Sequence, residues 1–261
     1  MEFSTILYNE SDAIARITLN RPDVFNACNE QLTAELRQAL EHAAQNDSVR
    51  CIVLTGAGRA FCSGQDLKEA PQAGSQRDLR DSLHRRYNPI IRLMRSIPKP
   101  IIAGINGVAA GAGLSLALAA DIRIMSTAAR LVEAFIGIAL IPDSGATFFY
   151  PRMLGYAKAF EFATLNKAIG PDEAYRLGLV NMLASPRAFP HALDTIARTY
   201  ASGPTRTYGM IKMLLQKGLV STLDEMLELE EQYQQLAGES DDYREGVAAF
   251  REKRAPNFTG H

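Results

Sequence analysis

The chain has 261 residues, of which 47% are hydrophobic, so it can bury a large core in one or two domains. Its 28 Lys and Arg residues nearly balance its 29 Asp and Glu residues, and the net charge of −1 argues against a nucleic acid as partner. No apolar run is long enough to span a membrane, and the N-terminus lacks the pattern of a signal peptide. We therefore expect no membrane partner and a cytoplasmic location.

The first part of the chain predicts strands that alternate with helices. Alternating apolar residues over 5–20 predict a β-hairpin around a polar turn at 9–12, and Pro22 predicts a loop. Asn29 should cap a helix, because apolar residues recur after it at helical spacing. The later predicted elements are a buried strand at 51–56, a charged helix at 75–97 interrupted by Pro89, a buried strand at 98–107, a Gly-rich turn that runs into an apolar helix over 109–121, and a strand at 122–126.

The pattern changes after Gly155. Helical periodicity continues to the end of the chain, Pro171, Ser221 and Ser240 are expected to start helices, and no further strand is predicted. Strands and helices followed by helices alone indicate an α/β core with a helical tail.

Several common kinds of site are missing from the sequence. Cys28, Cys51 and Cys62 lack the paired spacing of a metal site, and we expect them to be ordinary thiols. The four histidines occur in charged or terminal contexts, which favours surface positions. The chain contains no phosphate-binding Walker loop, no dinucleotide fingerprint and no His-Glu-x-x-His zinc motif.

Two loops could carry chemistry, because each follows a buried strand of the predicted α/β core. They are "GRAFCSGQDL" after the strand at 51–56 and "NGVAAGAGLS" after the strand that ends near Ile105. Ligands gather at the carboxyl ends of strands in α/β sheets, and small residues let them approach backbone N–H groups closely. The second loop also leads into a helix, whose first N–H groups favour an anionic oxygen.

Asp143 is a polar residue in an apolar setting, within the stretch "IPDSG". Asp is common in such turns, so a purely structural role is one interpretation. A second is a hydrolase triad of Ser115, Asp143 and His191, since "GLSLA" approximates the Gly-x-Ser-x-Gly motif. That motif requires a strand running directly into the serine, whereas Ser115 lies within an apolar helical run. A buried Ser115 bonded to a backbone carbonyl is therefore favoured.

Four long motifs resemble those of the crotonase (enoyl-CoA hydratase/isomerase) family in order and spacing: "NRPDVFNA", "LTGAGRAFCSGQDLKE", "PKPIIAGINGVAAGAGLSLALAADIRI" and "GIALIPDSGATFFYPRMLG". The resemblance covers nearly the whole chain. It implies an α/β fold, a crotonase-like spiral of ββα units over residues 1–200, with an all-helical trimerisation region over residues 201–261. It also implies a homotrimer, or a hexamer formed as a dimer of trimers.

The resemblance further implies an acyl-CoA thioester as substrate. The backbone N–H groups of Gln65 and Ala112 would hold the thioester oxygen while it becomes an enolate. Coenzyme A is then part of the substrate, and no metal or other cofactor is expected. The residues implied to lie along it are Arg21, Val24, Phe25, Asn26, Gln65, Asp66, Leu67 and Lys68.

The carboxylates indicate which reaction of the family is catalysed. Hydratases of this family use two glutamates, which would fall at Ser115 and Phe135, so hydration by that route is not expected. Asp143 stands where a single base could reach the acyl carbons, which is the arrangement of an isomerase. The stretches "IPDSG", "GQDL" and "RYNPIIR", and above all the tail "YQQLAGESDDYREGVAAFREKRAPNFTG", are similar to those of family members that isomerise the ring epoxide of an arylacetyl-CoA.

Two alternatives stay open. An aryl-CoA dehalogenase of the same fold also carries an Asp at this turn, but pairs it with a Trp and a His. This chain contains no Trp, and Asn88 stands near where that His would be. A non-catalytic CoA-binding module would explain the loss of both glutamates, although it would not explain Asp143.

Overall fold

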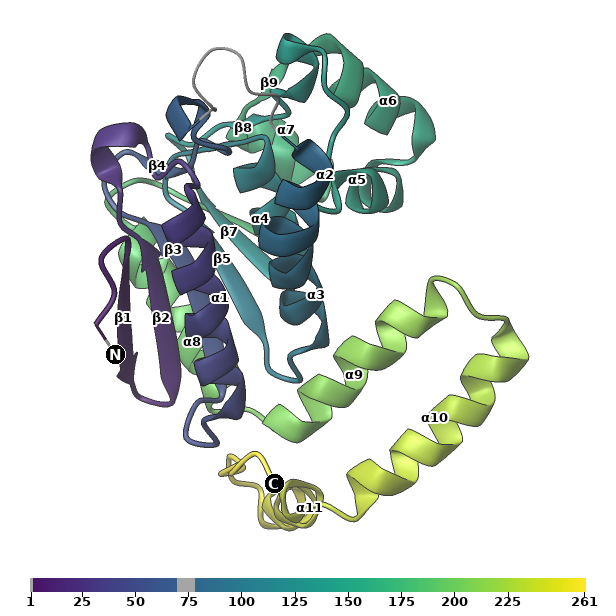
Figure 1. The fold of residues 1–261 in the computed structure, drawn as a ribbon. Helices are drawn as coiled ribbons and strands as arrows, with labels where there is room; N and C mark the ends of the chain where they lie inside the picture. The colour runs from purple at the N-terminus through teal and green to yellow at the C-terminus, as the bar shows by residue number, and fades with distance from the viewer. Residues whose placement is uncertain (1, 70–77) are drawn as a thin grey trace.

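A computed structural model describes residues 2–69 and 78–261. The strands form two sheets, and Figure 1 shows the larger one in the body of the molecule. The larger sheet contains, in spatial order, β1 (Ile6–Ser11), β2 (Ile14–Leu19), β3 (Cys51–Gly56), β5 (Ile101–Ile105), β7 (Ile122–Ser126) and β10 (Met182–Ala184). The smaller sheet contains β4 (Ala60–Cys62), β6 (Val108–Ala110), β8 (Leu131–Val132) and β9 (Ala168–Ile169).

The predicted hairpin is confirmed, with its turn shifted along the chain. Strands β1 and β2 are antiparallel, and Ser11 pairs with Ile14. The turn is therefore Asp12–Ala13 rather than residues 9–12, and both residues have positive φ, at 54° and 60°. A two-residue turn of this kind matches the twist of paired strands, whereas the polar composition of residues 9–12 does not fix its position.

The ββα spiral is also confirmed, and it corrects the prediction of two long loops. Strands β3, β5 and β7 lie parallel in the larger sheet, and each is followed by a short strand of the smaller sheet. Strands β4 and β6 thus lie inside the stretches expected to be loops. They have three residues each, too few for a recognisable alternating pattern.

Helices cover both faces of the larger sheet. The helices are α1 (Glu30–Gln45), α2 (Leu79–Ser82), α3 (Asn88–Ser96), α4 (Ala112–Ala119), α5 (Ala146–Leu154), α6 (Tyr156–Leu165), α7 (Pro171–Arg176), α8 (Phe189–Ala201), α9 (Thr205–Gly218), α10 (Leu223–Gly238) and α11 (Asp241–Glu252), with 3₁₀ turns η1 (Pro22–Val24), η2 (Leu67–Glu69) and η4 (Phe135–Ile138). Alternate residues of β3 point to opposite sides of the sheet: Ile52 and Leu54 pack toward α1, α3 and α4, whereas Val53 packs toward α8.

The charged helix around Pro89 continues through the proline instead of being interrupted there. A π-helical turn, η3 (Leu83–Tyr87), joins α2 to α3, and the Asn88 N–H bonds the carbonyl of Leu83, five residues earlier. The wider turn accommodates Pro89, which has no N–H to donate. Residues 75–77 of the predicted helix lie outside the described residues.

The expectation of helices alone after Gly155 is wrong. Strand β10 pairs in parallel with β7 at the edge of the larger sheet, and β9 pairs with β8 in the smaller one. Both strands have only two or three residues, so the surrounding helical periodicity concealed them.

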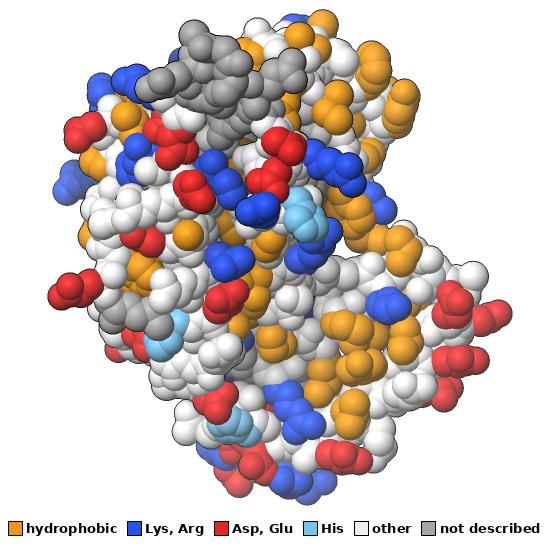
Figure 2. All heavy atoms as spheres, viewed as in Figure 1, with side chains coloured by type: hydrophobic (Ala, Val, Ile, Leu, Met, Phe, Trp, Pro, Cys, Tyr) orange, Lys and Arg blue, Asp and Glu red, His pale blue; other side chains and the backbone are white. Residues whose placement is uncertain are grey.

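Helices α9 and α10 project from the body of the molecule as an antiparallel pair (Figure 1). Figure 2 shows hydrophobic side chains gathered over this projecting pair. Exposed apolar residues on it are Ile211, Leu215, Leu219, Val220, Leu223 and Leu227. No helix in the described part of the chain is long and apolar enough to cross a membrane.

Candidate active site

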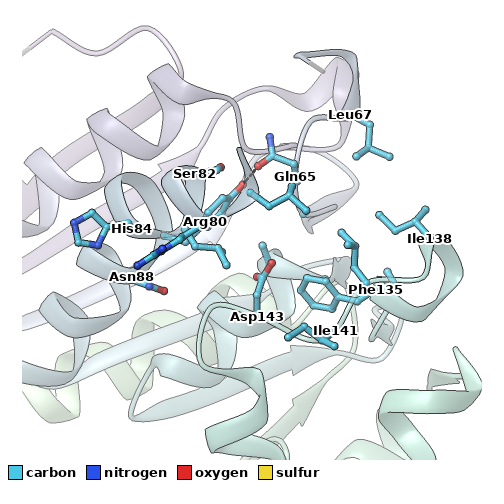
Figure 3. A pocket seen from close by; sticks show the side chains of 18 of the residues that line it. Gln65, Leu67, Arg80, Ser82, His84, Asn88, Phe135, Ile138, Ile141 and Asp143 are labelled. Atoms are coloured by element: carbon cyan, nitrogen blue, oxygen red, sulfur yellow. Dashed lines mark hydrogen bonds between the residues drawn. The ribbon is translucent and has the colours of Figure 1, made fainter. Parts of the chain in front are cut away.

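A cavity of about 840 Å³ opens between the start of α4, the α2–α3 helix and the turn before α5. Figure 3 shows lining side chains from the α2–α3 helix and from the segment before α5, together with Gln65 and Leu67 of the loop after β4. Most of its surface is apolar, and among the described lining residues Asp143 is the only carboxylate. Its lining includes Gln65, His84, Tyr87, Asn88, Ala112, Phe135 and Asp143.

The two predicted backbone donors, Gln65 and Ala112, both line this cavity. Ala112 is the first residue of α4, where N–H groups have no partner within a helix. Neither of these N–H groups donates a hydrogen bond to another residue of the described ranges. The two loops meet at Gly64, where an added Cβ would lie 2.8 Å from the Ala110 carbonyl oxygen and 3.5 Å from the Ala112 nitrogen. Within residues 2–69 and 78–261, the site therefore presents two backbone donors that have no partner, from adjacent loops.

Asp143 lies directly before the turn that leads into α5, and its carboxyl group points into the cavity toward Gln65 (Figure 3). Its backbone carbonyl accepts from the Ala146 N–H over 2.9 Å, which fixes the turn at the start of α5. Burial raises the pKa of the carboxyl above its ordinary value, and a 2.7 Å hydrogen bond from the Ser144 hydroxyl opposes that rise. The group is thus a poorly solvated base that shares the cavity with the two backbone donors of Gln65 and Ala112.

The hydrolase triad does not form. The hydroxyl of Ser115 is fully buried in α4 and donates to the backbone carbonyl of Asp143, as the alternative reading predicted. His191 lies on α8, which covers the opposite face of the larger sheet, and it does not line the cavity.

The residues expected along coenzyme A fall into two groups. Arg21 donates to the Ala27 carbonyl and to Asp66 over 2.6 and 2.9 Å, and Asn26 is fully buried, so these side chains hold the loop itself. The bond from Arg21 lowers the pKa of Asp66, although burial opposes this shift most strongly. Exposed side chains of this region are Phe25, Leu67 and Lys68, and Leu67 lines the cavity; Val24 is half-buried in η1.

Sequence reasoning from the residues missed the contribution of the α2–α3 helix. His84 is exposed, as expected of a surface histidine, yet it lines the cavity together with Tyr87 and Asn88. The π-helical turn brings these residues to the cavity wall, and helical periodicity alone could not have indicated that turn.

Glu133 is a second acidic residue near the site that sequence reasoning did not single out. It follows β8, its side chain is fully buried, and its Oε1 atom has no hydrogen-bond partner among the described residues. Burial, helped by the nearby charge of Asp143, raises the pKa of Glu133 to about 7. A run of apolar residues around one glutamate was the available signal.

The described residues contain no group of three or more His, Cys, Asp or Glu side chains placed to hold a metal ion. Cys28, Cys51 and Cys62 are buried free thiols, and the Cys28 and Cys62 sulfurs lie 3.4 Å apart.

Comparison with known proteins gives consistent matches along the chain. The family model for enoyl-CoA hydratase/isomerase matches residues 9–261. The chain is 42% identical over 262 residues to 1,2-epoxyphenylacetyl-CoA isomerase of Escherichia coli, covering 100% of this chain and 99% of that protein. It is 43% identical over 260 residues to a probable enoyl-CoA hydratase of Rhodobacter capsulatus, covering 100% of both. The crystal structure of enoyl-CoA hydratase from Bacillus anthracis superposes with a TM-score of 0.93 at 31% identity, covering 99% of this chain and 100% of that one.

Proposed function

The chain belongs to the enoyl-CoA hydratase/isomerase family, and within that family we propose that it is an acyl-CoA isomerase whose acid/base is Asp143. The observation that carries this proposal is the pairing of one desolvated carboxyl group with two free backbone N–H groups in one apolar cavity. Proton transfer beside a thioester needs a base and a site for the developing negative charge.

The proposed reaction moves one proton. The N–H groups of Gln65 and Ala112 bind the thioester oxygen, and Asp143 removes a proton from the α-carbon. The resulting dienolate carries its negative charge on that oxygen. Each donor stabilises the developing charge in the transition state by roughly 3–4 kcal/mol. Asp143 then returns the proton to the γ-carbon, so a 3,4 double bond becomes a 2,3 double bond. Every atom of the substrate is retained.

Hydration receives less support from the site. Ser115 and Phe135 occupy the positions expected for the two glutamates of a hydratase. The Ser115 hydroxyl is engaged by the Asp143 carbonyl, and Phe135 adds an apolar wall. Among the described lining residues there is no second carboxyl group, so they do not supply the pair expected to position and activate water.

The finer proposal concerns the acyl group and its pathway. We favour 2-(1,2-epoxy-1,2-dihydrophenyl)acetyl-CoA, converted to its oxepin isomer in phenylacetate catabolism, with linear 3-enoyl-CoA as a second substrate. The E. coli relative named for the epoxide supports this choice, as does a largely apolar cavity of about 840 Å³. Coenzyme A would run over the exposed side chains of Phe25, Leu67 and Lys68.

The proposed assembly is a homotrimer, or a hexamer formed by two trimers, held by residues 201–261. The exposed apolar residues of the α9–α10 pair support this proposal, because a monomer would leave them in water. Light scattering on the purified chain would give its molecular mass and so the number of subunits.

The test of function is turnover of a 3-enoyl-CoA, followed by the absorbance of the conjugated 2-enoyl thioester. Asp143→Asn should bind CoA normally and lose at least about 100-fold in kcat. The matched control is Asp172→Asn, an exposed residue on α7, which should behave as the wild type. Activity of Asp143→Asn within a few-fold of the wild type would contradict the proposal. A second assay would use the ring epoxide as substrate with the same variants. Release of halide from a 4-halobenzoyl-CoA would indicate a dehalogenase instead of an isomerase.

A further inference from the structure

We propose that Tyr87 is a positioning residue that holds the Gln65 N–H in the orientation needed to bind the thioester oxygen. This inference rests on the proposed function, since it concerns one of the two donors assigned to that oxygen. It adds a residue from the α2–α3 helix to the three groups proposed for catalysis, which are Gln65, Ala112 and Asp143.

The side chain of Gln65 is held at both ends. The Tyr87 hydroxyl donates to its Oε1 atom over 2.5 Å, the interaction drawn beside Gln65 in Figure 3. Its Nε2 atom donates to the carbonyls of Cys28 and Asp66 over 3.1 and 3.3 Å. The Gln65 amide therefore links three segments that are distant in sequence, and its position defines the spacing between them.

Backbone hydrogen bonds to Cys28 also fix the orientation of the main chain around Gln65. The Gly64 carbonyl accepts from the Cys28 N–H over 2.7 Å, and the Asp66 N–H donates to the Cys28 carbonyl over 3.0 Å. A trans peptide directs its C=O and N–H to opposite sides. Because the Gly64 carbonyl points toward Cys28, the Gln65 N–H of the same peptide points away from it, on the side where Gln65 lines the cavity.

The π-helical turn supplies the partner. Tyr87 is its last residue and is only 3% exposed, so its hydroxyl is directed inward at Gln65. Arg86 of the same turn donates to the Cys28 carbonyl over 3.3 Å and lies 3.6 Å from Glu69. Turn and loop are thus joined on both sides of Gln65, and such π-helical turns often occur at functional sites.

The phenol is suited to this role because it stays neutral. Burial raises the pKa of Tyr87 above its ordinary value, so the hydroxyl keeps its proton and donates it to the Gln65 carbonyl group. An ionised phenol could only accept, and the bond to Oε1 would be lost.

The test compares Tyr87→Phe with Tyr8→Phe. The Tyr8 hydroxyl donates a hydrogen bond to Glu10 on the distant hairpin. Each variant therefore loses one hydroxyl group and the hydrogen bond that it donates. The first readout is the absorbance of a bound aryl-conjugated enoyl-CoA, whose band moves to longer wavelength when donors polarise its carbonyl. The second is kcat for a 3-enoyl-CoA, and the third is the affinity for CoA alone.

We expect Tyr87→Phe to reduce the wavelength shift and to lower kcat by about 10- to 100-fold, because small misplacements of a catalytic group have effects of that size. CoA affinity should stay within about twofold, and Tyr8→Phe should match the wild type. Gln65→Ala keeps the N–H but removes the amide, so it should reproduce the loss. The double variant should lose no more than Gln65→Ala alone, because removal of the Gln65 amide already breaks the hydrogen bond to Tyr87.

If the wavelength shift and the kcat of Tyr87→Phe equal those of the wild type, the proposed role of Tyr87 is overturned. If Tyr87→Phe does not fold, Gln65→Ala decides in its place, and an unchanged shift there would overturn the proposal equally. The wavelength shift needs no turnover, so the two proposals can fail separately. A wild type that shifts the band but isomerises nothing would refute the isomerase alone, whereas a wild type that does not shift the band would refute the positioning role.

Discussion

The hydroxyl of Ser115 donates a hydrogen bond to the backbone carbonyl of Asp143 over 3.0 Å. Ser115 lies one turn after Ala112 in α4, so a single helix carries one of the proposed oxyanion donors and also fixes the turn that presents the proposed base. The distance between donor and base therefore depends on α4 rather than on two independent loops.

Ser115→Ala should lower kcat about 3- to 30-fold while leaving KM nearly unchanged, because the Asp143 turn loses one of its anchors. The free energy of unfolding should fall by about 1–2 kcal/mol, the usual effect of removing such a hydrogen bond. The control is Ser96→Ala, since Ser96 donates to the Leu93 carbonyl at the exposed end of α3, away from the cavity. Equal effects of the two substitutions on kcat would contradict this account.

The activity should decline on the acid side of a pH profile, because Asp143 works as a base only when ionised. Burial raises the pKa of Asp143, so the decline should begin at a higher pH than an exposed aspartate would give. The Ser144 hydroxyl stabilises the carboxylate over 2.7 Å. Ser144→Ala should therefore move the acid limb of kcat/KM to still higher pH, and a shift to lower pH would be inconsistent with this assignment.

Glu133→Gln should change the pH dependence of stability. The pKa of Glu133 is about 7 in the folded chain against an ordinary 4.5, so the folded state holds its proton over the interval in which the unfolded chain has lost it. The contribution of this group to stability is fully present below pH 4.5 and is lost as the pH rises toward 7. The variant should thus match the wild type at pH 4 and be more stable at pH 8, by about 1–3 kcal/mol.

Urea denaturation at both pH values would measure this difference. Glu173→Gln, an exposed residue on α7, is the matched control and should show no such change between the two pH values. A Glu133→Gln variant that is less stable than the wild type at pH 8 would show that the buried carboxylate has a stabilising partner.

Gly113→Ala should destabilise the protein by about 1–3 kcal/mol and lower kcat, because the new Cβ would lie 2.3 Å from the Cys62 carbonyl oxygen. Only a shift of α4 away from β4 relieves this overlap, and that shift displaces Ala112. Gly238→Ala is the control: it ends α10, no heavy atom lies within 4 Å of its added Cβ, and it should be neutral or slightly stabilising. Thermal unfolding and kcat of both variants test the contrast.

Local signals predicted much of the fold. Asn29 caps α1 by accepting from the Leu32 N–H over 2.8 Å, and the apolar run at Cys51–Gly56 is a central strand. These features follow from short-range chemistry that the sequence displays directly. The short strands β4, β6, β9 and β10 escaped prediction because their two or three residues pair only through contacts that are distant in sequence.

The candidate site also combines residues that the sequence indicated with residues that only tertiary contacts place there. Motif resemblance indicated Gln65, Ala112 and Asp143, and all three line one cavity. Tyr87 could not be placed, because its approach to Gln65 depends on one extra residue in a helical turn. Glu133 was equally hidden, since burial of a carboxyl group follows from tertiary packing rather than from its neighbours in sequence.

The late position of β9 and β10 in the chain has a consequence for biosynthesis. Strands β7 and β8 emerge from the ribosome well before their outer partners, which begin at Met182 and Ala168. During that interval both sheets present an unpaired edge, and such edges readily pair with other chains. Fragments that stop before residue 168 keep both edges open, so they should aggregate where the full chain stays in solution.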